Sequence, residues 1–215
     1  MAHTHKSYLP AAGHDFFLPL YDPITRLFGI DKAREVLLER AALRRGHRVL
    51  DVGCGTGSLA ILIKRLHPDV EVVGLDPDPK ALARAQKKAE RAGVSVQFDR
   101  GFSDALPYAG ATFDRVFSSM MFHHIPGEAK PRTLAEIRRV LKPGGRFEML
   151  DLGGPDEGKG GAIARLLHSH ALLKDNAEHR VLELMTNAGL ADAARVGIAS
   201  TVFGRLAYYE AVRAD

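Results

Sequence analysis

The sequence predicts an α/β fold in which a mostly parallel sheet carries helices on both faces. Three observations support this: short apolar runs alternate with helical patterns, a glycine turn follows the first run, and an acidic residue ends the second. Alternating strands and helices build parallel sheets through crossover connections, so we expect a doubly wound, three-layer α/β/α domain. Two further apolar runs near the C-terminus predict an antiparallel hairpin, which brings the expected sheet to seven strands.

The chain has the size and composition of an ordinary globular protein. Its 215 residues suit one domain with a full-sized core, and no apolar run approaches the length of a membrane span. The first residues lack the apolar core of a secretory signal, so we expect a cytoplasmic protein. The single cysteine, Cys54, excludes an internal disulfide and lies in the glycine turn, where a small side chain is needed.

Charge and histidine content limit the expected partners. The formal net charge is +4, spread along the chain, and no basic patch is interleaved with aromatic residues as in nucleic-acid-binding proteins. We therefore expect no nucleic-acid partner. A weak contact with an anionic membrane surface stays open, as does the choice between a monomer and a homodimer. His3 and His5 have no carboxylate or cysteine beside them, so no metal site is expected.

Residues 1–46 precede the first expected strand, and residues 47–215 form the expected nucleotide-binding domain. Residues 15–28 combine aromatic side chains with two prolines, Pro19 and Pro23, which predicts a broken helix. Asp31 is expected to cap a regular helix over residues 32–43. A bare domain of this class does not need such a segment. We therefore expect it either to cover the cofactor cleft as a lid or only to pack on the sheet.

The first expected strand, Val49 to Val52, is apolar apart from Asp51. A helix from Ser58 to about Leu66 follows, and its free N–H groups and positive dipole end face the turn between them. Strand, turn and helix N-terminus together make a site for the anionic or polar part of a nucleotide-like cofactor. The turn carries a glycine at every second position: Gly53, Gly55 and Gly57.

The glycine spacing selects among cofactors. A dinucleotide fingerprint has the spacing G-x-G-x-x-G, whereas this chain has G-x-G-x-G with Asp51 two residues before the first glycine. A carboxylate at that position repels a pyrophosphate. It suits a ligand that carries an ammonium and a sulfonium group, and S-adenosylmethionine carries both.

This stretch resembles the first motif, D-x-G-x-G-x-G, of the class I S-adenosylmethionine-dependent methyltransferases, which have a Rossmann-like fold. The resemblance implies that Asp51 and the backbone of Gly53 and Gly55 hold the methionine part of the cofactor. The expected function is transfer of a methyl group to an O, N, S or C nucleophile of a small-molecule acceptor. Two other classes stay open: a nicotinamide-dependent oxidoreductase, against which the glycine spacing argues, and a non-catalytic cofactor-binding partner.

The second expected strand, Val70 to Leu75, ends at Asp76. A carboxylate at the tip of the second strand is placed to accept hydrogen bonds from both ribose hydroxyls, worth about 1.5–3 kcal/mol each. The alternative is that Asp76 only opens the turn before Asp78, which is expected to cap a helix over residues 79–92. The position of Asp76 at the strand end, its spacing from the glycine turn and its carboxylate all favour the role in binding ribose.

The third expected strand covers residues 94–98. The loop that follows it should flank the adenine ring. Residues 101–108 resemble the family pattern G-D-A-x-x-L-P-[FY], in which the aspartate takes the adenine amino group, but this chain has Phe102 there. Phe102 could stack on the ring, the backbone of Ser103 could contact its edge, or Asp104 could reach it. Phe102 could also belong to the core. Residues expected beside adenine are Pro77, Phe102, Ser103 and Leu106.

The fourth expected strand covers residues 113–119. The loop that follows it should lie over the sulfonium methyl, because ligands of doubly wound sheets bind at the carboxyl ends of the strands. His123 and His124 match a histidine segment of the family and are candidates for the base that accepts a proton from the acceptor. The alternative is that one of them packs inward. A backbone carbonyl near Ser118 or Ser119 is expected to accept a hydrogen bond from the cofactor's ammonium.

The remaining elements follow in order. The Lys142-Pro143-Gly144-Gly145 run matches the motif that ends a helix and reverses the chain in these methyltransferases. Residues 153–175 read as an insertion near the substrate pocket, with a helix over residues 162–173. The elements expected around them are a helix over residues 130–141, a strand over 146–152, a helix over 178–187 and strands over 194–200 and 202–210.

Within the class, the chain resembles the ubiquinone/menaquinone C-methyltransferases. Tyr21-Asp22 resembles the Y-D segment near the start of those proteins, which favours the lid, and Tyr21 is the residue we expect nearest the transferred methyl group. Two departures are present. Pro-Ile follows that segment in place of Met-Asn, and the fifth strand ends Asp151-Leu152-Gly153 in place of a Glu-Phe-Ser-like run. The acceptor therefore stays open from the sequence.

Overall fold

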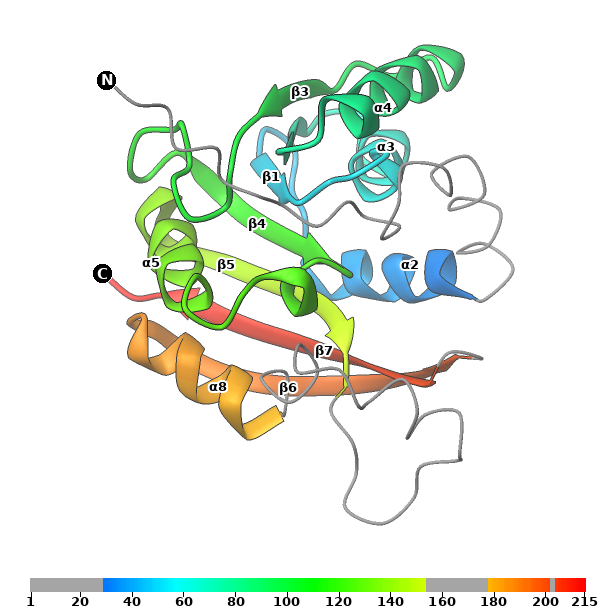
Figure 1. Cartoon of the computed structure of the whole chain (residues 1–215). Helices are drawn as coiled ribbons and strands as arrows, with labels where there is room; N and C mark the ends of the chain where they lie inside the picture. Colours follow the sequence, from blue (N-terminus) through cyan, green and yellow to red (C-terminus); the bar gives the residue numbers. More distant parts are fainter. Residues whose placement is uncertain (1–28, 154–177, 202–203) are drawn as a thin grey trace.

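The computed structural model describes residues 29–153, 178–201 and 204–215, and these build a seven-stranded sheet flanked by helices (Figure 1). The strand order is β3-β2-β1-β4-β5-β7-β6. All pairs from β3 to β5 are parallel, whereas β7 runs antiparallel to β5 and β6, which confirms the expected α/β class and hairpin. The strands are β1 (Arg48–Val52), β2 (Glu71–Asp76), β3 (Gln97–Arg100), β4 (Phe113–Ser119), β5 (Leu141–Leu152), β6 (Leu190–Thr201) and β7 (Gly204–Arg213).

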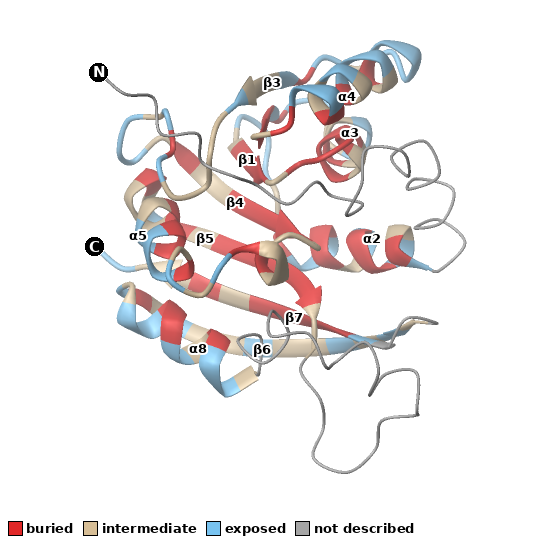
Figure 2. Cartoon of the chain, viewed as in Figure 1, coloured by how far each residue is buried: buried red, intermediate tan, exposed pale blue. Residues whose placement is uncertain are grey.

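Helices cover both faces of the sheet because successive strand residues point in opposite directions. Leu50 on β1 packs in a buried cluster with Leu134, and its neighbour Val49 packs in a second cluster with Leu37. Figure 2 shows the resulting buried interior along β1, β4 and β5. The helices are α2 (Ile30–Arg40), α3 (Ser58–Leu66), α4 (Pro79–Arg91), the short 3₁₀ helix η2 (Phe122–His124), α5 (Lys130–Val140) and α8 (Glu178–Asn187).

Local capping signals place helix α4 as expected. Asp78 precedes α4, and its side chain accepts a hydrogen bond from the N–H of Lys80 at 2.8 Å, with Pro79 in the first turn. The buried face of α4 carries Ala81, Ala85 and Ala89.

Two elements near the N-terminal half differ from expectation. Helix α2 begins at Ile30 after Gly29, and Asp31 lies in its first turn, where it pairs with Arg34 at 3.1 Å instead of capping the helix. Strand β3 covers residues 97–100 rather than 94–98, since its register opposite β2 begins at the pair Val73 and Gln97. Pairing across the sheet, which local sequence does not encode, sets that register.

Strand β5 is longer than expected because it includes the Lys142–Gly145 turn. Its pairing with β4 jumps from Leu141 opposite Phe113 to Arg146 opposite Arg115, so four residues bulge there against one. The expected helix over residues 162–173, most of the 153–175 insertion and Tyr21 lie outside the described residues. No helix in the described ranges has the length and apolar character needed to cross a membrane. Those ranges also contain no group of three or more metal-binding side chains.

Glu148 on β5 is a buried carboxylate whose ionisation is unfavourable in the folded state. Its side chain is fully buried, and neither carboxylate oxygen has a hydrogen-bond partner in the described part of the chain. Oε1 lies 3.0 Å from Nη2 of Arg146, which also pairs with Glu210 at 2.8 Å. Burial raises the pKa of Glu148 to about 7, and the attraction of Arg146 limits the rise.

The free energy of unfolding should decrease as pH rises from about 5 to about 8. We expect this decrease to be smaller after Glu148→Gln. Between pH 4.5, the ordinary pKa, and about 7, the folded protein keeps a proton that the unfolded chain has released. The free energy of unfolding therefore falls as pH rises through this window, by about 2–3 kcal/mol for Glu148. Burial also raises the pKa of Asp51 to about 7, so Asp51 likewise lowers the free energy of unfolding as pH rises through this window.

Urea unfolding at about pH 5 and about pH 8 measures this effect. The decrease in the free energy of unfolding should be smaller in E148Q than in the unmodified protein. Glu71→Gln is the matched control, because the Glu71 side chain is 75% exposed and should leave the decrease unchanged. Equal decreases in all three proteins would contradict the assignment.

Candidate functional site

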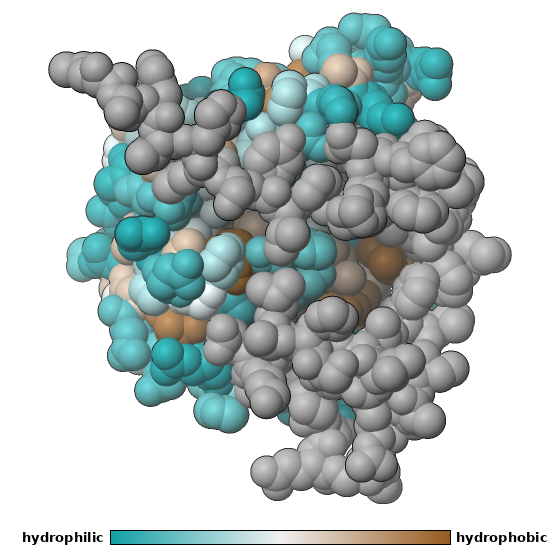
Figure 3. Space-filling view, viewed as in Figure 1, coloured by the Kyte–Doolittle hydropathy of each residue, from teal (hydrophilic) through white to brown (hydrophobic). Residues whose placement is uncertain are grey.

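A cavity of about 650 Å³ lies at the carboxyl ends of β1, β2 and β4. We call it the main cavity. Its wall comes from the glycine turn after β1, the end of β2, the loops after β3 and β4, and Arg34 of α2. Figure 3 shows apolar side chains near the middle of the molecule in this view. In Figure 1, which has the same orientation, β4 and β5 end in that region. The main cavity therefore lies at the place where the sequence predicts the cofactor site.

The three glycines of the turn have different roles. All have positive φ, of 72° at Gly53, 53° at Gly55 and 74° at Gly57, a conformation that favours glycine. Gly53 and Gly55 line the main cavity. A Cβ on Gly55 would have no atom of the described residues within 4 Å, so these residues leave the backbone open to a ligand, whereas a Cβ on Gly57 would meet Ala85 at 2.9 Å. Gly57 therefore serves the packing of α3 against α4.

Gly53→Ala should destabilise the protein by about 3 kcal/mol or more. A Cβ at Gly53 would lie 2.1 Å from Cγ of Met121, so overpacking adds to the cost of the left-handed conformation. Gly46→Ala is the matched control, because Gly46 has φ of +78° with no atom within 4 Å of the added Cβ. It should cost about 1–2 kcal/mol. Urea unfolding compares the two, and equal losses would show that Met121 yields freely.

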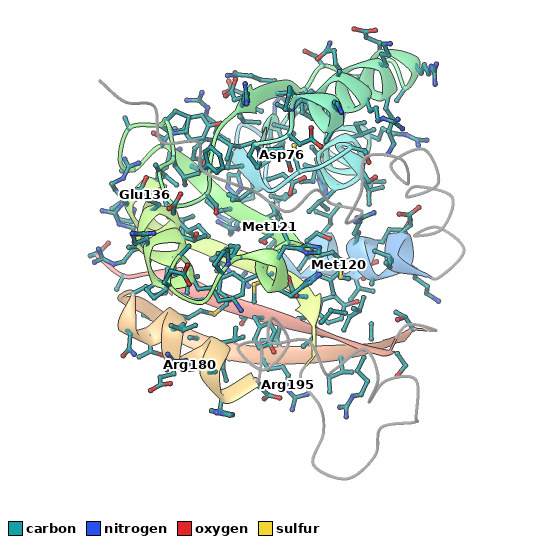
Figure 4. The ribbon with its side chains drawn as sticks, in the orientation of Figure 1. Asp76, Met120, Met121, Glu136, Arg180 and Arg195 are labelled. Carbon is teal, nitrogen blue, oxygen red and sulfur yellow. The ribbon has the colours of Figure 1, made fainter. Side chains whose placement is uncertain are left out.

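Asp76 ties the cavity wall together. Its carboxylate is 8% exposed and accepts hydrogen bonds from the N–H groups of Gly55 at 2.8 Å and Asp78 at 2.9 Å. Burial raises the pKa of Asp76, against the effect of these two bonds. Figure 4 shows Asp76 at the end of β2, across from Met121 in the loop after β4. Each carboxylate oxygen keeps a further lone pair, so Asp76 can still accept from ligand hydroxyls.

Asp51 lies beneath the glycine turn and is not among the residues that line the main cavity. It is 1% exposed, accepts a hydrogen bond from the N–H of Ala60, and its Oδ2 has no partner in the described residues. Burial raises the pKa of Asp51 to about 7, while the charge of Arg34 lowers it. Contact between Asp51 and the methionine part of a cofactor stays a prediction.

Of the four residues expected beside adenine, all but Leu106 line the main cavity, and their contact with adenine stays a prediction. Pro77, Phe102 and Ser103 line the main cavity, together with Asp104. Phe102 is partly exposed there, so it belongs to the wall rather than to the core. Leu106 is 5% exposed and packs in the core instead, where its N–H donates to Glu136 at 2.7 Å.

Of the two serines at the end of β4, the structure brings Ser119 rather than Ser118 to the main cavity. Ser118 is fully buried, and its hydroxyl has no hydrogen-bond partner in the described residues. Consecutive strand residues point to opposite faces, so a difference of one position changes the side of the sheet.

Arg34 is a cavity residue that sequence reasoning missed. It is 4% exposed, pairs with Asp31 at 3.1 Å and donates from Nε to the hydroxyl of Ser119 at 3.3 Å. The available signal was an arginine one turn from Leu37 and Leu38 on the apolar face of a helix, because buried arginines are rare unless paired. A guanidinium at this place can hold a carboxylate.

The two adjacent histidines point to different surroundings. His124 lines the main cavity, and burial, followed by the charge of His123, lowers its pKa to about 4. His123 lies outside the wall, and its Nδ1 is 2.7 Å from Oδ1 of Asp151. The ring centroids of the two histidines are 4.0 Å apart. His124 is therefore neutral near pH 7 and able to accept a proton or a hydrogen bond from a ligand.

Asp151 fixes the turn that carries both histidines. Besides its contact with His123, it accepts from the N–H of Phe122 at 2.8 Å and of Leu152 at 2.7 Å. Burial alone would raise the pKa of Asp151, but the charge of His123 and its hydrogen bond lower it. Met120, which opens the turn, has φ of 59°, a conformation that costs free energy in a residue with a side chain. The turn is thus held in shape by Asp151.

Comparison with known proteins agrees with this geometry. Residues 49–145 match the family model described as a methyltransferase domain. A demethylmenaquinone methyltransferase from Deinococcus radiodurans is 38% identical over 157 residues, which are 72% of this chain and 64% of that protein. One of the same description from Thermus thermophilus is 37% identical over 161 residues, covering 72% and 70% respectively.

The fold also occurs in proteins with other reactions. The crystal structure of the [4+2]-cyclase SpnF matches with a TM-score of 0.71 at 22% identity, over 86% of this chain and 80% of that chain. This likeness concerns the fold alone, whereas the family rests on the closer sequence relatives. With motifs, cavity and relatives in agreement, the chain belongs to the class I S-adenosylmethionine-dependent methyltransferases of the ubiquinone/menaquinone type.

Proposed function

We propose that this methyltransferase methylates a hydroxylated aromatic acceptor of the hydroquinone class on a ring carbon. The observation that carries the proposal is a neutral His124 in a partly apolar wall beside the glycine turn. The apolar side chains of such a wall can pack against a flat, apolar ring, and His124 can accept a hydrogen bond from its hydroxyl group. The names of the relatives, both demethylmenaquinone methyltransferases, support the same acceptor class. The apolar members of this wall are Met120, Met121, Ile125, Pro126 and Ala129.

The residues present fit S-adenosylmethionine, whose contribution when bound is an electrophilic methyl group on sulfonium. The open backbone at Gly55 leaves room for the ligand chain, since a Cβ there would meet no atom of the described part of the chain within 4 Å. Asp76 would hold the ribose hydroxyls, and Phe102 would cover the adenine face. Arg34 would hold the carboxylate of the methionine part, because it is a buried cation with Ser119 beside it. Together these residues would fix the methyl in line with the acceptor.

The second task of the protein is to handle the acceptor's proton. Methylation of a hydroxylated ring at carbon releases one proton, and the ring becomes more nucleophilic as its hydroxyl ionises. His124 would accept the hydroxyl proton or its hydrogen bond. Asp151 would act as a positioning residue, because it holds Phe122 and His123 and thereby sets where His124 lies. His123, outside the wall, would support its neighbour rather than touch the acceptor.

The cover of the site stays a prediction of the sequence. Methyl transfer requires that water be kept from the sulfonium, and the expected lid, with Tyr21 nearest the methyl, together with the 153–175 insertion would supply that cover. Residues 1–28 and 154–177 lie outside the described part of the chain. The cytoplasmic location, the monomer or homodimer and the absence of a nucleic-acid partner likewise stay predictions.

Incubation with S-adenosylmethionine labelled in its methyl group tests the proposal. A 2-substituted 1,4-dihydroxynaphthalene should take up label on a ring carbon, located by mass spectrometry and NMR. Its dimethoxy analogue, which has no hydroxyl proton, is the matched control and should take up none. Label on oxygen would contradict carbon methylation. Equal label in both compounds would contradict the role of the hydroxyl.

A further inference from the structure

A second hollow lies at the opposite end of the sheet from the main cavity. It has a volume of about 310 Å³ and is formed by the segment between α2 and β1, the start of β4 and the turn at the start of β5. Strands β4 and β5 run parallel away from this end (Figure 1), so the hollow is separate from the methyltransferase site. Its lining is mostly charged or polar: Arg44, His47, Asp114, Arg115, Lys142, Pro143, Gly144 and Gly145.

The hollow carries an excess of positive charge. Its single carboxylate, Asp114, accepts from Nζ of Lys142 at 2.8 and 2.9 Å and from the N–H of Arg48 at 2.8 Å. Burial would raise the pKa of Asp114, but these bonds outweigh it and lower the pKa. Asp114 is therefore ionised and engaged by Lys142. Among the described residues of the lining, three cations and one carboxylate leave two positive charges, those of Arg44 and Arg115, without a compensating anion.

Arg115 is held in the hollow at an electrostatic cost. Its Nε donates to the carbonyl of Ala41 at 2.8 Å and its Nη1 to the carbonyl of Asp114 at 2.7 Å, and both of these acceptors are neutral. Burial, and then the charge of Arg146, lower the pKa of Arg115. An anion in the hollow would offset this cost.

His47 and the glycine turn add neutral groups to the same lining. Nδ1 of His47 accepts from the N–H of Arg44 at 3.3 Å, so the neutral ring carries its proton on Nε2, which is a donor. Burial and the charge of Arg115 lower the pKa of His47, which keeps the ring neutral near pH 7. Gly144 has φ of +71°, and a Cβ added there would have none of the described atoms within 4 Å, so these residues leave the backbone open at this point.

We propose that the second hollow binds a phosphate group, carried either by a small soluble molecule or by the headgroup of an anionic phospholipid. A guanidinium offers paired donors that match phosphate oxygens, and the lining provides two of them. A phosphate monoester of charge about −1.5 to −2 compensates the excess of two positive charges, whereas a phosphodiester headgroup, with a single negative charge, compensates half of it. The hollow is large enough for a phosphate with part of the group that carries it. This site is independent of the proposed methyl acceptor.

Titration of the full-length protein with inorganic phosphate, followed by ³¹P NMR at constant ionic strength, tests the site. Arg44→Gln should raise the dissociation constant about tenfold, the loss expected for one charge-assisted hydrogen bond. Arg45→Gln makes the same charge change at the neighbouring residue, whose side chain is 88% exposed and outside the hollow. It should change the constant less than about twofold. Absence of saturable binding, or equal effects of both substitutions, would overturn the proposal.

Vesicle sedimentation separates the two sources of the phosphate group. Vesicles of phosphatidylcholine alone are compared with vesicles that also contain phosphatidylglycerol. Binding to the anionic vesicles that R44Q abolishes, R45Q preserves and inorganic phosphate competes away would identify a lipid headgroup. Saturable, Arg44-dependent binding of inorganic phosphate without vesicle binding would identify a soluble phosphate. Vesicle binding that both substitutions weaken equally would reflect general surface charge and overturn the specific site.

Discussion

Replacing Asp76 with alanine is expected to weaken binding of S-adenosylhomocysteine by about 2–4 kcal/mol, roughly 30- to 1000-fold in the dissociation constant. Two ribose hydroxyls would lose their acceptor in a partly dry cavity. The substitution also removes the acceptor of the N–H groups of Gly55 and Asp78, so the glycine turn and the start of α4 lose a shared anchor. Isothermal titration calorimetry of the purified protein measures the change.

Asp99→Ala is the matched control for this experiment. Asp99 lies on the neighbouring strand β3 and accepts from the hydroxyl of Tyr108 at 2.9 Å, but it does not line the main cavity. Its replacement should leave cofactor affinity within about twofold. An unchanged affinity in D76A would show that the ribose is held elsewhere. An equal loss in D99A would point to general destabilisation rather than a lost contact.

Local sequence signals predicted the elements that carry the glycine turn. The bounds of α3 and β4 agree with expectation, and β1 and β2 differ by one residue at their ends. These elements have strong local determinants: a short apolar run, a glycine with positive φ or a proline in the first helical turn. The shift of β3 and the length of β5 depend instead on pairing between strands. Such pairing involves residues far apart in the sequence.

The residues of the candidate site likewise fall into those that local motifs predict and those that only long-range contacts reveal. Asp76, Gly55 and Phe102 were found because each lies at a fixed distance from a strand end or a glycine motif. Arg34 was missed because its contact with Ser119 joins residues 85 positions apart.

The histidine pair shows the same limit. Its motif predicted two candidate bases, but only the fold shows that Asp151, 28 positions later, binds His123 and leaves His124 facing the cavity. The choice between Ser118 and Ser119 stayed open because the sequence does not encode which face of β4 looks toward the ligand, and the structure brings Ser119 to the main cavity.

Replacing His124 with glutamine is expected to lower kcat by about 10²- to 10⁴-fold, the usual contribution of a positioned general base. Glutamine can accept a hydrogen bond from an acceptor hydroxyl, but it does not take up its proton. Affinity for S-adenosylhomocysteine should stay within about twofold, because the proposed cofactor contacts are made by other residues. Turnover with a hydroxylated aromatic acceptor and calorimetry with the product cofactor measure the two quantities separately.

The pH dependence distinguishes His124 from an ordinary histidine base. A base works in its neutral form, so activity falls as pH drops through its pKa. Burial lowers the pKa of His124 to about 4, so the acid side of the kcat profile should stay flat down to about pH 5. A histidine with the ordinary pKa of 6.5 would instead begin to lose activity above pH 6. An acid limb near pH 6.5 that vanishes in H124Q would contradict the lowered pKa while supporting His124 as the base.

His123→Gln and Asp151→Asn separate chemistry from positioning. Either substitution weakens the contact that holds the turn, so kcat should fall about 10- to 100-fold, less than in H124Q. The flat acid side of the profile should persist in both, because neither removes the base. A larger loss of kcat in H123Q than in H124Q would make His123 the base and refute our assignment. Parallel losses of folding stability and activity in all three variants would show that the pair serves the core, since a base can be removed without unfolding the protein.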